Sequence, residues 1–404
     1  MSRSSTAMRA VTAMRTLTGR IEDSTPPSRD RAVDALRALA ILGVVLGHWL
    51  VTALVSDSGS IYTTSPLRHM PLLAPVSWLF QTLAVFFLVG GRVGTQGYLA
   101  ARVRGHSYWQ WLGGRLGRLA RPVGIVLAVW AVAIVLMLGS GVEPETVRAL
   151  AKLVVSPLWF LLVFAGLTAL TPLVRHVHPL WPVAVVAAVD LGRFALDGPA
   201  WLGWVNLAAA WLVPYTLGAW WARRGLPSVA VRWGLLAGGA AATAALVIWA
   251  GYPASMVGVT GAKISNLHPP TLAAAVFGLA QCGLALLLHG PLTRVLRRPA
   301  AWAAVALANL SAMTIFLWHQ TAMIGVTALG MLAGRPLPGL HTVPDGSEWI
   351  AARLAWLPVF VVALAGCWVL FRGYERPAGR RSRARRAAAG DGPAPEPCPI
   401  PAEA

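Results

Sequence analysis

Residues 31–55 read RAVDALRALAILGVVLGHWLVTALV, and this stretch decides the fold. After Arg37 no charged residue follows until Asp57, and His48 is the only ionisable side chain between them. An uncharged run of about 20 residues is long enough to cross the hydrocarbon core of a bilayer as a helix. The stretch therefore predicts a transmembrane helix that carries Asp34 and Arg37 near its start and His48 at mid-membrane.

Nine further apolar stretches follow this one. The ten predicted spans cover approximately residues 36–55, 72–91, 123–138, 153–174, 180–196, 201–221, 233–250, 271–289, 300–329 and 350–371. The fifth is the weakest, because Asp190 and Arg193 interrupt it. These two lie three residues apart on one helical face, so we expect them to pair near the bilayer surface. The fold class predicted is all-α, a polytopic transmembrane bundle of about ten helices.

The composition of the whole chain excludes two other classes of protein. Of its 404 residues, 56% are hydrophobic and 12% are charged, against about 25% charged in an average soluble domain. This is not the composition of a water-soluble enzyme. A net charge of +19 would suggest nucleic-acid binding, but such proteins carry their charge on a solvated face. We therefore expect no nucleic-acid partner.

The positions of the 34 basic residues predict the topology. Cytoplasmic loops of membrane proteins collect Arg and Lys. With the N-terminus inside, 25 basic residues fall in cytoplasmic segments and 7 in outer ones. This asymmetry favours both termini in the cytoplasm and a multi-pass protein of the plasma membrane. The positive charge is thus chiefly a topology signal.

Both ends of the chain differ in composition from the apolar region. Residues 1–30 are rich in Ser, Thr and Arg, and residues 377–404 in Arg, Pro and Ala, so we predict two disordered tails around a membrane domain at 31–376. The three cysteines, Cys282, Cys367 and Cys398, lie far apart without metal-ligand spacing. We expect neither a disulfide nor a metal site.

Arg37 and His48 are the first candidates for a functional site. Eleven residues of helix return to within about 20° of the same face and rise about 16 Å. One polar stripe therefore runs from the cytoplasmic mouth into the membrane, and Asp34 can pair with Arg37 one turn away. Alternatively, Asp34 and Arg37 form only an interfacial pair, and His48 bridges two helices.

A second histidine, His319, lies in the ninth predicted span, within the sequence Trp318-His319-Gln320. Two histidines at membrane depth favour proton chemistry, because imidazole titrates near neutral pH. The alternative is that His319 only forms a hydrogen bond between packed helices.

The inner loop after the second span contains Arg115, Arg118 and Arg121. Their three-residue spacing lets one helical turn present two guanidinium groups together, and guanidinium forks suit phosphate oxygens. Arg92, at the inner end of the second span, is added to this group as a candidate anion ligand. The alternative is that these arginines serve only to anchor the loop on the cytoplasmic side.

Several of these segments resemble the acyltransferase 3 family of integral-membrane acyltransferases. The signature of its opening segment is an Arg and a His separated by ten residues, which Arg37 and His48 match. Arg115 and Arg118 resemble its inner-loop Arg pair, with Arg121 as an alternative register, and the segment Trp318-His319-Gln320 resembles its late "YLWH" stretch. The segments GHW, FFLVGG and SNLHPP are most similar to actinobacterial members. The resemblance covers residues 31–375.

The chain departs from the family pattern at two places. Gly90 stands where a Ser usually precedes the second-helix glycine, so the role of that hydroxyl does not transfer. Residues 158–161 resemble the start of the family's fourth helix, but the Glu often found shortly afterwards is absent.

The resemblance implies transfer of an acyl group, commonly acetyl from acetyl-CoA, to a hydroxyl of a carbohydrate or other natural product. His48 would act as the general base, or would itself be acylated first. Arg37, with the arginines of the inner loop, would orient the donor phosphates, and His319 would position the acceptor or stabilise the oxyanion. The acyl-CoA is a substrate, and no metal is required. The acceptor is a cell-wall glycan, an exopolysaccharide, a glycolipid or a secreted antibiotic.

A different class of function stays open. The chain is alternatively a transporter or an export partner for a glycan or lipid-linked substrate, which uses the polar helix positions as a path and performs no chemistry. The absence of a recognisable internal repeat and the stripe from Arg37 to His48 favour the enzyme.

Overall fold

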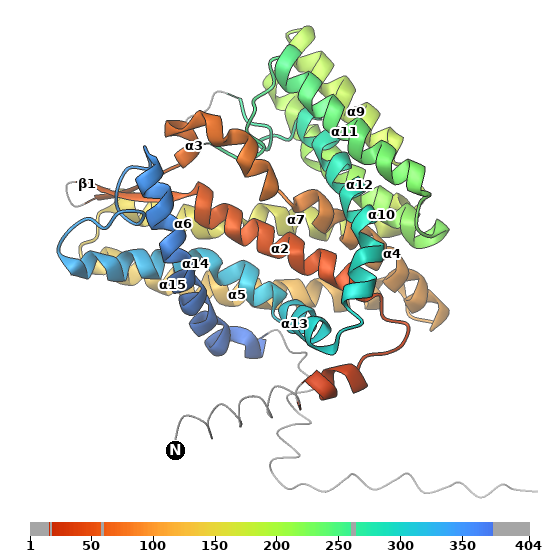
Figure 1. Ribbon diagram of the computed structural model, residues 1–404, viewed down its shortest axis with the longest axis horizontal. Helices are drawn as coiled ribbons and strands as arrows, with labels where there is room; N and C mark the ends of the chain where they lie inside the picture. The colour runs from red at the N-terminus through yellow and green to blue at the C-terminus, as the bar shows by residue number, and fades with distance from the viewer. Residues whose placement is uncertain (1–15, 17, 58–59, 260–263, 375–404) are drawn as a thin grey trace, which may run out of the picture.

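The chain folds into a bundle of α-helices with one small hairpin, and the computed structural model describes residues 16, 18–57, 60–259 and 264–374 (Figure 1). The long helices are α2 (Arg31–Val51), α4 (Leu83–Val103), α5 (Tyr108–Gly139), α10 (Val205–Arg224), α11 (Val229–Trp249), α12 (Leu272–Val295), α14 (Ala312–Gly330) and α15 (Ser347–Phe371). The shorter helices are α3 (Pro66–His69), α6 (Pro144–Val155), α7 (Leu158–Ala169), α8 (Thr171–Val174), α9 (Leu180–Asp190) and α13 (Pro299–Leu310). Short 3₁₀ and π-helical segments complete the set: η1 (Pro71–Leu79), η2 (Leu191–Ala195), η3 (Ala200–Trp204), η4 (Met331–Ala333) and η5 (Arg372–Tyr374). Strands β1 (Ala53–Asp57) and β2 (Ser60–Thr64) pair antiparallel.

Eight segments of the described chain are long and apolar enough to cross a membrane. They are Arg31–Val51, Pro71–Val103, Tyr108–Gly139, Pro144–Ala169, Val229–Trp249, Leu272–Val295, Ala312–Ala333 and Ser347–Tyr374. The predicted all-α, polytopic bundle is therefore confirmed. The side of the membrane that each terminus faces stays a prediction.

The two remaining predicted spans, 180–196 and 201–221, are not among these eight, and the second is the continuous helix α10. The first is an 11-residue helix, α9, that continues as the π-helical turn η2. Asp190 lies 3.9 Å from Arg193 but is not a surface pair. Its buried carboxylate accepts hydrogen bonds from the Asn206 amide, the Tyr252 hydroxyl and the Leu272 backbone N–H. A polar network thus anchors α9 to α10 and α12.

Three other predicted spans are interrupted. The stretch 36–55 ends as a helix at Val51, because residues 53–64 form the hairpin of β1 and β2, so His48 lies in the last helical turn rather than near mid-helix. The stretch 153–174 is divided among α6, α7 and α8. The stretch 300–329 breaks at Ser311 into α13 and α14.

The segment expected as an Arg-rich inner loop is the beginning of α5. This helix starts after a capping box, in which Ser107 and Gln110 each accept a hydrogen bond from the other's backbone N–H. Its 32 residues make it about 48 Å long, which exceeds the roughly 30 Å hydrocarbon core. The first turns, which carry the arginines, can therefore extend beyond the core as helix.

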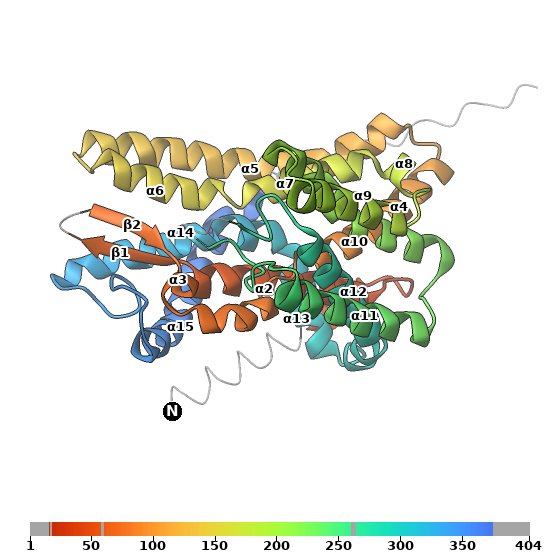
Figure 2. The same cartoon turned by 90° about the horizontal axis from the view of Figure 1, so that it is seen from above.

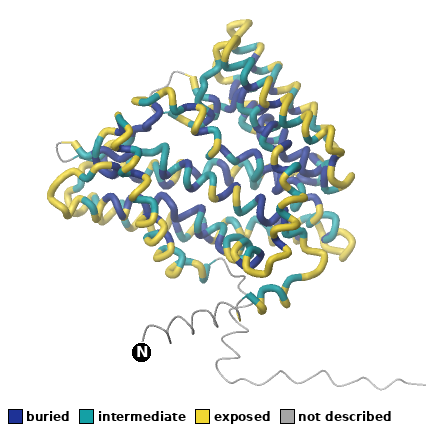
Figure 3. Tube along the Cα trace, viewed as in Figure 1, coloured by how far each residue is buried: buried dark blue, intermediate teal, exposed yellow. Residues whose placement is uncertain are grey.

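α2 occupies the middle of the bundle, in contact with α4, α12, α13, α14 and α15. In Figure 2, α5 and α6 lie along one face, α15 lies toward the opposite face, and α14 runs between them. Figure 3 shows burial concentrated on these central segments and exposure on the outer helices. The outer, apolar surfaces are those expected to face lipid.

α4 and α10 approach each other closely through glycines. A Cβ added at Gly91 would overlap the carbonyl oxygen of Tyr215, and one at Gly218 would overlap that of Leu88. Small residues of this kind let membrane helices pack backbone against backbone. The GG pair in the sequence FFLVGG is thereby explained in part by packing.

Part of the predicted N-terminal tail is described. The Arg31 guanidinium pairs with Glu22 at 2.6 Å, and Trp302 Nε1 donates to Thr25 Oγ1 at 2.8 Å. Residues 18–30 thus contact the start of α2 and α13. Residues 1–15, residue 17 and the predicted C-terminal tail from 377 lie outside the described residues, and the tail assignments stay predictions.

Candidate functional site

One face of α2 lines two cavities. Val33, Asp34, Arg37 and Ile41 border the first cavity, and Val44, Gly47, His48, Val51 and Thr52 border the second. These positions recur every three or four residues, which is the spacing of a single helical face. Arg37 and His48 therefore lie on one side of α2, as their spacing indicates, and each belongs to a different cavity.

The first cavity has a volume of about 800 Å³, and we call it the arginine cavity. Seven charged residues line it: Arg29, Arg37, Arg92, Arg115, Arg118, Asp30 and Asp34. Five positive groups against two negative ones leave an excess of positive charge. Such a cavity attracts an anion with several charges.

Arg37 is fixed by two partners. Its Nη2 atom lies 3.2 Å from the Asp34 carboxylate, which is the predicted pair, and its Nε donates to the Asn309 side-chain oxygen at 2.5 Å. The Asn309 amide in turn donates to the backbone carbonyl of Asp34 at 2.7 Å. Asn309 can reach α2 because α13 ends at Leu310, where the predicted long helix is broken.

Asp34 is shared with a second arginine. Arg29 makes a bidentate contact with its carboxylate, through Nε at 2.5 Å and Nη2 at 2.9 Å. The Arg29 side chain is half exposed, whereas that of Asp34 is 7% exposed. The loop just before α2 thus contributes a cation to the mouth of the arginine cavity.

Asp30 joins three elements at the edge of the same cavity. Its carboxylate accepts from Arg92 of α4 at 2.7 Å and lies 3.1 Å from His289 Nε2 of α12. Burial favours the neutral acid, but the hydrogen bond and charge of His289, together with Arg92, outweigh it and hold the pKa of Asp30 below its usual value. Arg92 also stacks over Trp221, 3.9 Å from the ring centre.

The arginines of α5 differ in position. Arg115 donates to the Val93 carbonyl at 2.7 Å and packs against Gly97, where a side chain would collide with it. Arg118 is exposed and donates to the Gly114 carbonyl of its own helix. Both line the arginine cavity, whereas Arg121 is exposed and does not. The register of Arg115 and Arg118 is the one that faces the cavity.

The second cavity has a volume of about 330 Å³, and we call it the histidine cavity. Its polar lining groups are His48, Thr52, Thr63, Thr64, Ser65, Gln81, Lys152, Ser156, His268 and Gln320. No aspartate or glutamate is among the described residues that line it. Thr63 and Thr64 belong to strand β2, which therefore supplies part of the wall.

His48 contacts two residues of α14. Gln320 Nε2 lies 3.1 Å from His48 Nδ1, and the ring centres of His48 and His319 are 5.1 Å apart. Gln320 Oε1 is buried without a hydrogen-bond partner among the described residues. His319 Nδ1 lies 2.5 Å from the Phe316 carbonyl oxygen, which fixes its ring. His319 packs behind His48 and lines neither cavity.

Arg353 supports the same end of α2. The predicted topology places it among the seven basic residues of the outer segments. In the structure it is 1% exposed and lies within α15. Its guanidinium donates to the carbonyls of Trp49, Thr52 and Gly339 at 2.7–2.8 Å. A lone arginine inside a long apolar helix is the sequence signal that indicates such a role.

The SNLHPP segment is also placed by side chains. Asn266 is fully buried and donates to the carbonyls of Pro253 and Ser255, and its oxygen accepts from Thr271 at the N-cap of α12. His268 lies between Trp159 and Trp204, with ring centres about 6 Å away, at the edge of the histidine cavity. Asn266 therefore orders the loop, and His268 is the member of this segment that reaches the cavity.

Comparison with known proteins completes the description of the site. A family model described as an acyltransferase domain, that of acyltransferase 3, matches residues 30–372. No curated protein and no solved structure matches the chain. The matched region contains α2 and every predicted site residue, and among the residues that line the two cavities only Pro26, Ser28 and Arg29 lie outside it. The chain therefore belongs to the acyltransferase 3 family of membrane acyltransferases.

Proposed function

We propose that this membrane acyltransferase moves an acyl group, most commonly acetyl, from cytoplasmic acyl-CoA to a hydroxyl of a carbohydrate, a glycolipid or another natural product. The observation that carries the proposal is the pairing of an arginine cavity and a histidine cavity along one face of α2. The plasma membrane is the proposed location, with the arginine cavity toward the cytoplasm.

The arginine cavity suits the nucleotide end of CoA, which carries several phosphate groups. Arg37, Arg92, Arg115 and Arg118 would bind these phosphates, because guanidinium groups form strong, charge-assisted hydrogen bonds to phosphate oxygens. The 11-residue rise from Arg37 to His48 is about 16 Å, a distance that the thin pantetheine arm can cover. The thioester would then lie beside His48.

The histidine cavity suits the acceptor. Its hydroxyl and amide groups, together with the Lys152 ammonium, offer hydrogen bonds to a polar molecule. The acceptor hydroxyl attacks the thioester carbonyl while His48 takes its proton. The carbon–sulfur bond then breaks, and the CoA thiolate leaves and is protonated, which gives an ester and free CoA. Asp34 and Asn309 hold Arg37 at the entrance, where Arg29 also pairs with Asp34, and His319 acts through the ring of His48.

A two-step route uses the same groups. His48 would first attack the thioester to form an acyl-imidazole, and the acceptor hydroxyl would then take the acyl group from it. Incubation of the protein with labelled acetyl-CoA without acceptor distinguishes the routes, because only the two-step route labels the protein in wild type and loses that label in His48→Ala.

The first test is transfer of label from acetyl-CoA. Membranes containing the chain should incorporate labelled acetyl into extractable glycan or glycolipid, and membranes containing His48→Ala should not. An exposed histidine outside both cavities, His106, provides the control His106→Ala. Solute flux into liposomes that contain the protein, without acyl-CoA and without label transfer, would support the transporter instead.

The second test compares two arginines of α5, Arg115 and Arg121, by their effect on the binding of acetyl-CoA. Removing a charge-assisted hydrogen bond costs about 1.5–3 kcal/mol, which corresponds to roughly a 10- to 100-fold weaker binding constant. Arg115→Ala should raise the Kd for acetyl-CoA by this amount. Arg121→Ala, whose side chain is outside the cavity, should change it much less. Equal effects of the two substitutions would contradict the assignment.

A further inference from the structure

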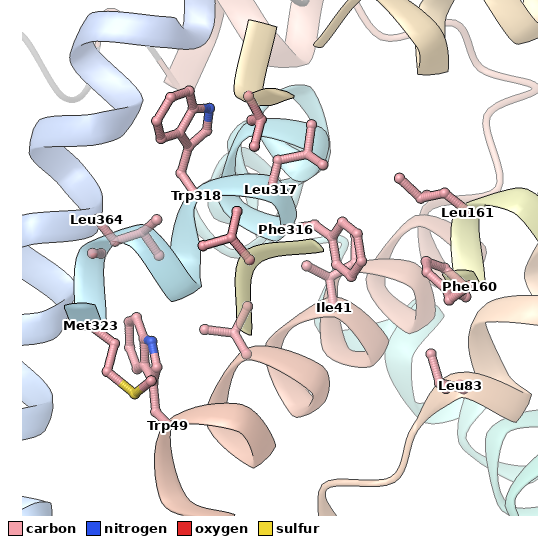
Figure 4. Close-up of a cluster of buried hydrophobic side chains, with 14 of the residues drawn as sticks. Ile41, Trp49, Leu83, Phe160, Leu161, Phe316, Leu317, Trp318, Met323 and Leu364 are labelled. Carbon is pink, nitrogen blue, oxygen red and sulfur yellow. The ribbon is translucent and has the colours of Figure 1, made fainter. Parts of the chain in front are cut away.

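The two cavities meet at two phenylalanines. Phe160 of α7 and Phe316 of α14 are the residues common to both cavity linings. Their ring centres are 5.3 Å apart in an edge-to-face arrangement, and both side chains are at least 95% buried. Figure 4 shows Phe316 on the side of α14 that faces Phe160, with Ile41 of α2 beside it. The boundary between the cavities is therefore made of side chains.

The phenylalanine pair lies about halfway between Arg37, which is proposed to bind the donor phosphates, and His48, the proposed base. On α2, Ile41 belongs to the arginine cavity and Val44 to the histidine cavity. Ile41 is one turn from Arg37, and Val44 is one turn from His48. The rings therefore stand roughly 8 Å along the helix axis from either residue.

Neighbouring rings hold the pair in place. Phe160 contacts Phe86, Phe87 and Phe164, with ring centres 5.0–6.3 Å away. Phe316 packs against the ring of His319, 5.9 Å away. Each such aromatic pair contributes about 0.5–1.5 kcal/mol, so these contacts keep the two rings at the boundary between the cavities.

A donor that enters from the arginine cavity presents its acyl group first. The acyl group must therefore pass Phe160 and Phe316 before the pantetheine arm can follow it. We infer that this phenylalanine pair is a constriction that selects the donor by the width of its acyl group, admitting straight, narrow groups and excluding branched or aromatic ones. The inference rests on the proposed function, because it requires the donor to bind in this direction.

The test measures binding of CoA thioethers to the purified full chain, so it does not depend on turnover or on the acceptor. S-ethyl-CoA and S-benzyl-CoA place a narrow and a wide group where the acyl group would be. Apolar pockets discriminate by about 10- to 200-fold for small changes in shape. Wild type should therefore bind S-ethyl-CoA at least tenfold more tightly than S-benzyl-CoA, and Phe316→Ala or Phe160→Ala should bring the two within about threefold.

The controls keep the result interpretable. Phe194→Ala removes an exposed ring outside both cavities and should keep the wild-type ratio. Phe316→Leu keeps an apolar side chain at this position, and it replaces Phe316→Ala in the comparison if the alanine variant does not fold. Equal binding of both thioethers by wild type, or an unchanged ratio in the variants, would overturn the constriction. Failure of every CoA compound to bind at any width would overturn the donor assignment itself.

Discussion

Gln320 determines which nitrogen of His48 is free to take a proton. With its amide nitrogen toward the ring, Nδ1 of His48 accepts and the ring proton resides on Nε2. With Oε1 toward the ring, Nδ1 donates and Nε2 is free. The second orientation also gives a partner to Oε1, which is otherwise buried and unpaired. A general base at His48 requires the second orientation.

This requirement predicts opposite results for two substitutions. Gln320→Glu keeps an oxygen acceptor for Nδ1–H and should retain most of the acyl transfer. Gln320→Leu removes it, leaves the ring N–H unpaired, and should lower turnover by roughly 10- to 100-fold, the equivalent of about 1.4–2.7 kcal/mol. Turnover with labelled acetyl-CoA is the measurement. Comparable loss in both variants would show that Gln320 donates to His48 instead.

The sequence predicts some of these residues and not others. The spacing of Arg37 and His48 is a local property of one helix, so a single sequence is sufficient to place them on one face. Asn309, Gln320 and Phe160 act on residues of other helices, and their partners are distant in the chain. No periodicity indicates such pairs, because the contact depends on how the helices cross.

At the scale of the elements, helix breaks position the site. Apolar composition predicts where a helix can cross a membrane, but it cannot show that residues 300–329 divide at Ser311. Ser311 Oγ accepts a hydrogen bond from Trp368 Nε1 at 2.5 Å, which supplies a partner at the break. Apolar composition likewise does not show that residues 153–174 are divided, with Ser156 and Pro157 between α6 and α7. Because the sequence stays apolar through both breaks, hydropathy alone does not reveal them.

Arg353 predicts a stability effect at this scale. Its side chain satisfies three carbonyls around the C-terminal end of α2, and Arg353→Leu would leave them buried without a donor. Each unsatisfied buried group costs about 1–3 kcal/mol, so the free energy of unfolding should fall by about 3 kcal/mol or more. Unfolding of the detergent-solubilised protein in SDS measures this. Arg335→Leu, at an exposed position, is the control and should have little effect.

At the scale of the whole molecule, Asp30 connects α2, α4 and α12. Because its folded pKa is lowered, its ionised form stabilises the folded state above the unfolded pKa of about 4. That contribution is lost as pH falls through the folded pKa. Wild type should therefore exceed Asp30→Asn in thermal stability at pH 6, and the difference should shrink below about pH 4. A difference that stays constant from pH 6 to pH 3 would contradict this role.

The central claim for the whole molecule is that donor binding and proton transfer occur at different ends of α2. The most direct measurement is the turnover of His48→Ala at saturating labelled acetyl-CoA, with the Kd for acetyl-CoA measured on the same preparation. We predict that turnover falls by about 100- to 10,000-fold, while the Kd stays within a few-fold of wild type. Near-normal turnover in this variant would contradict the account.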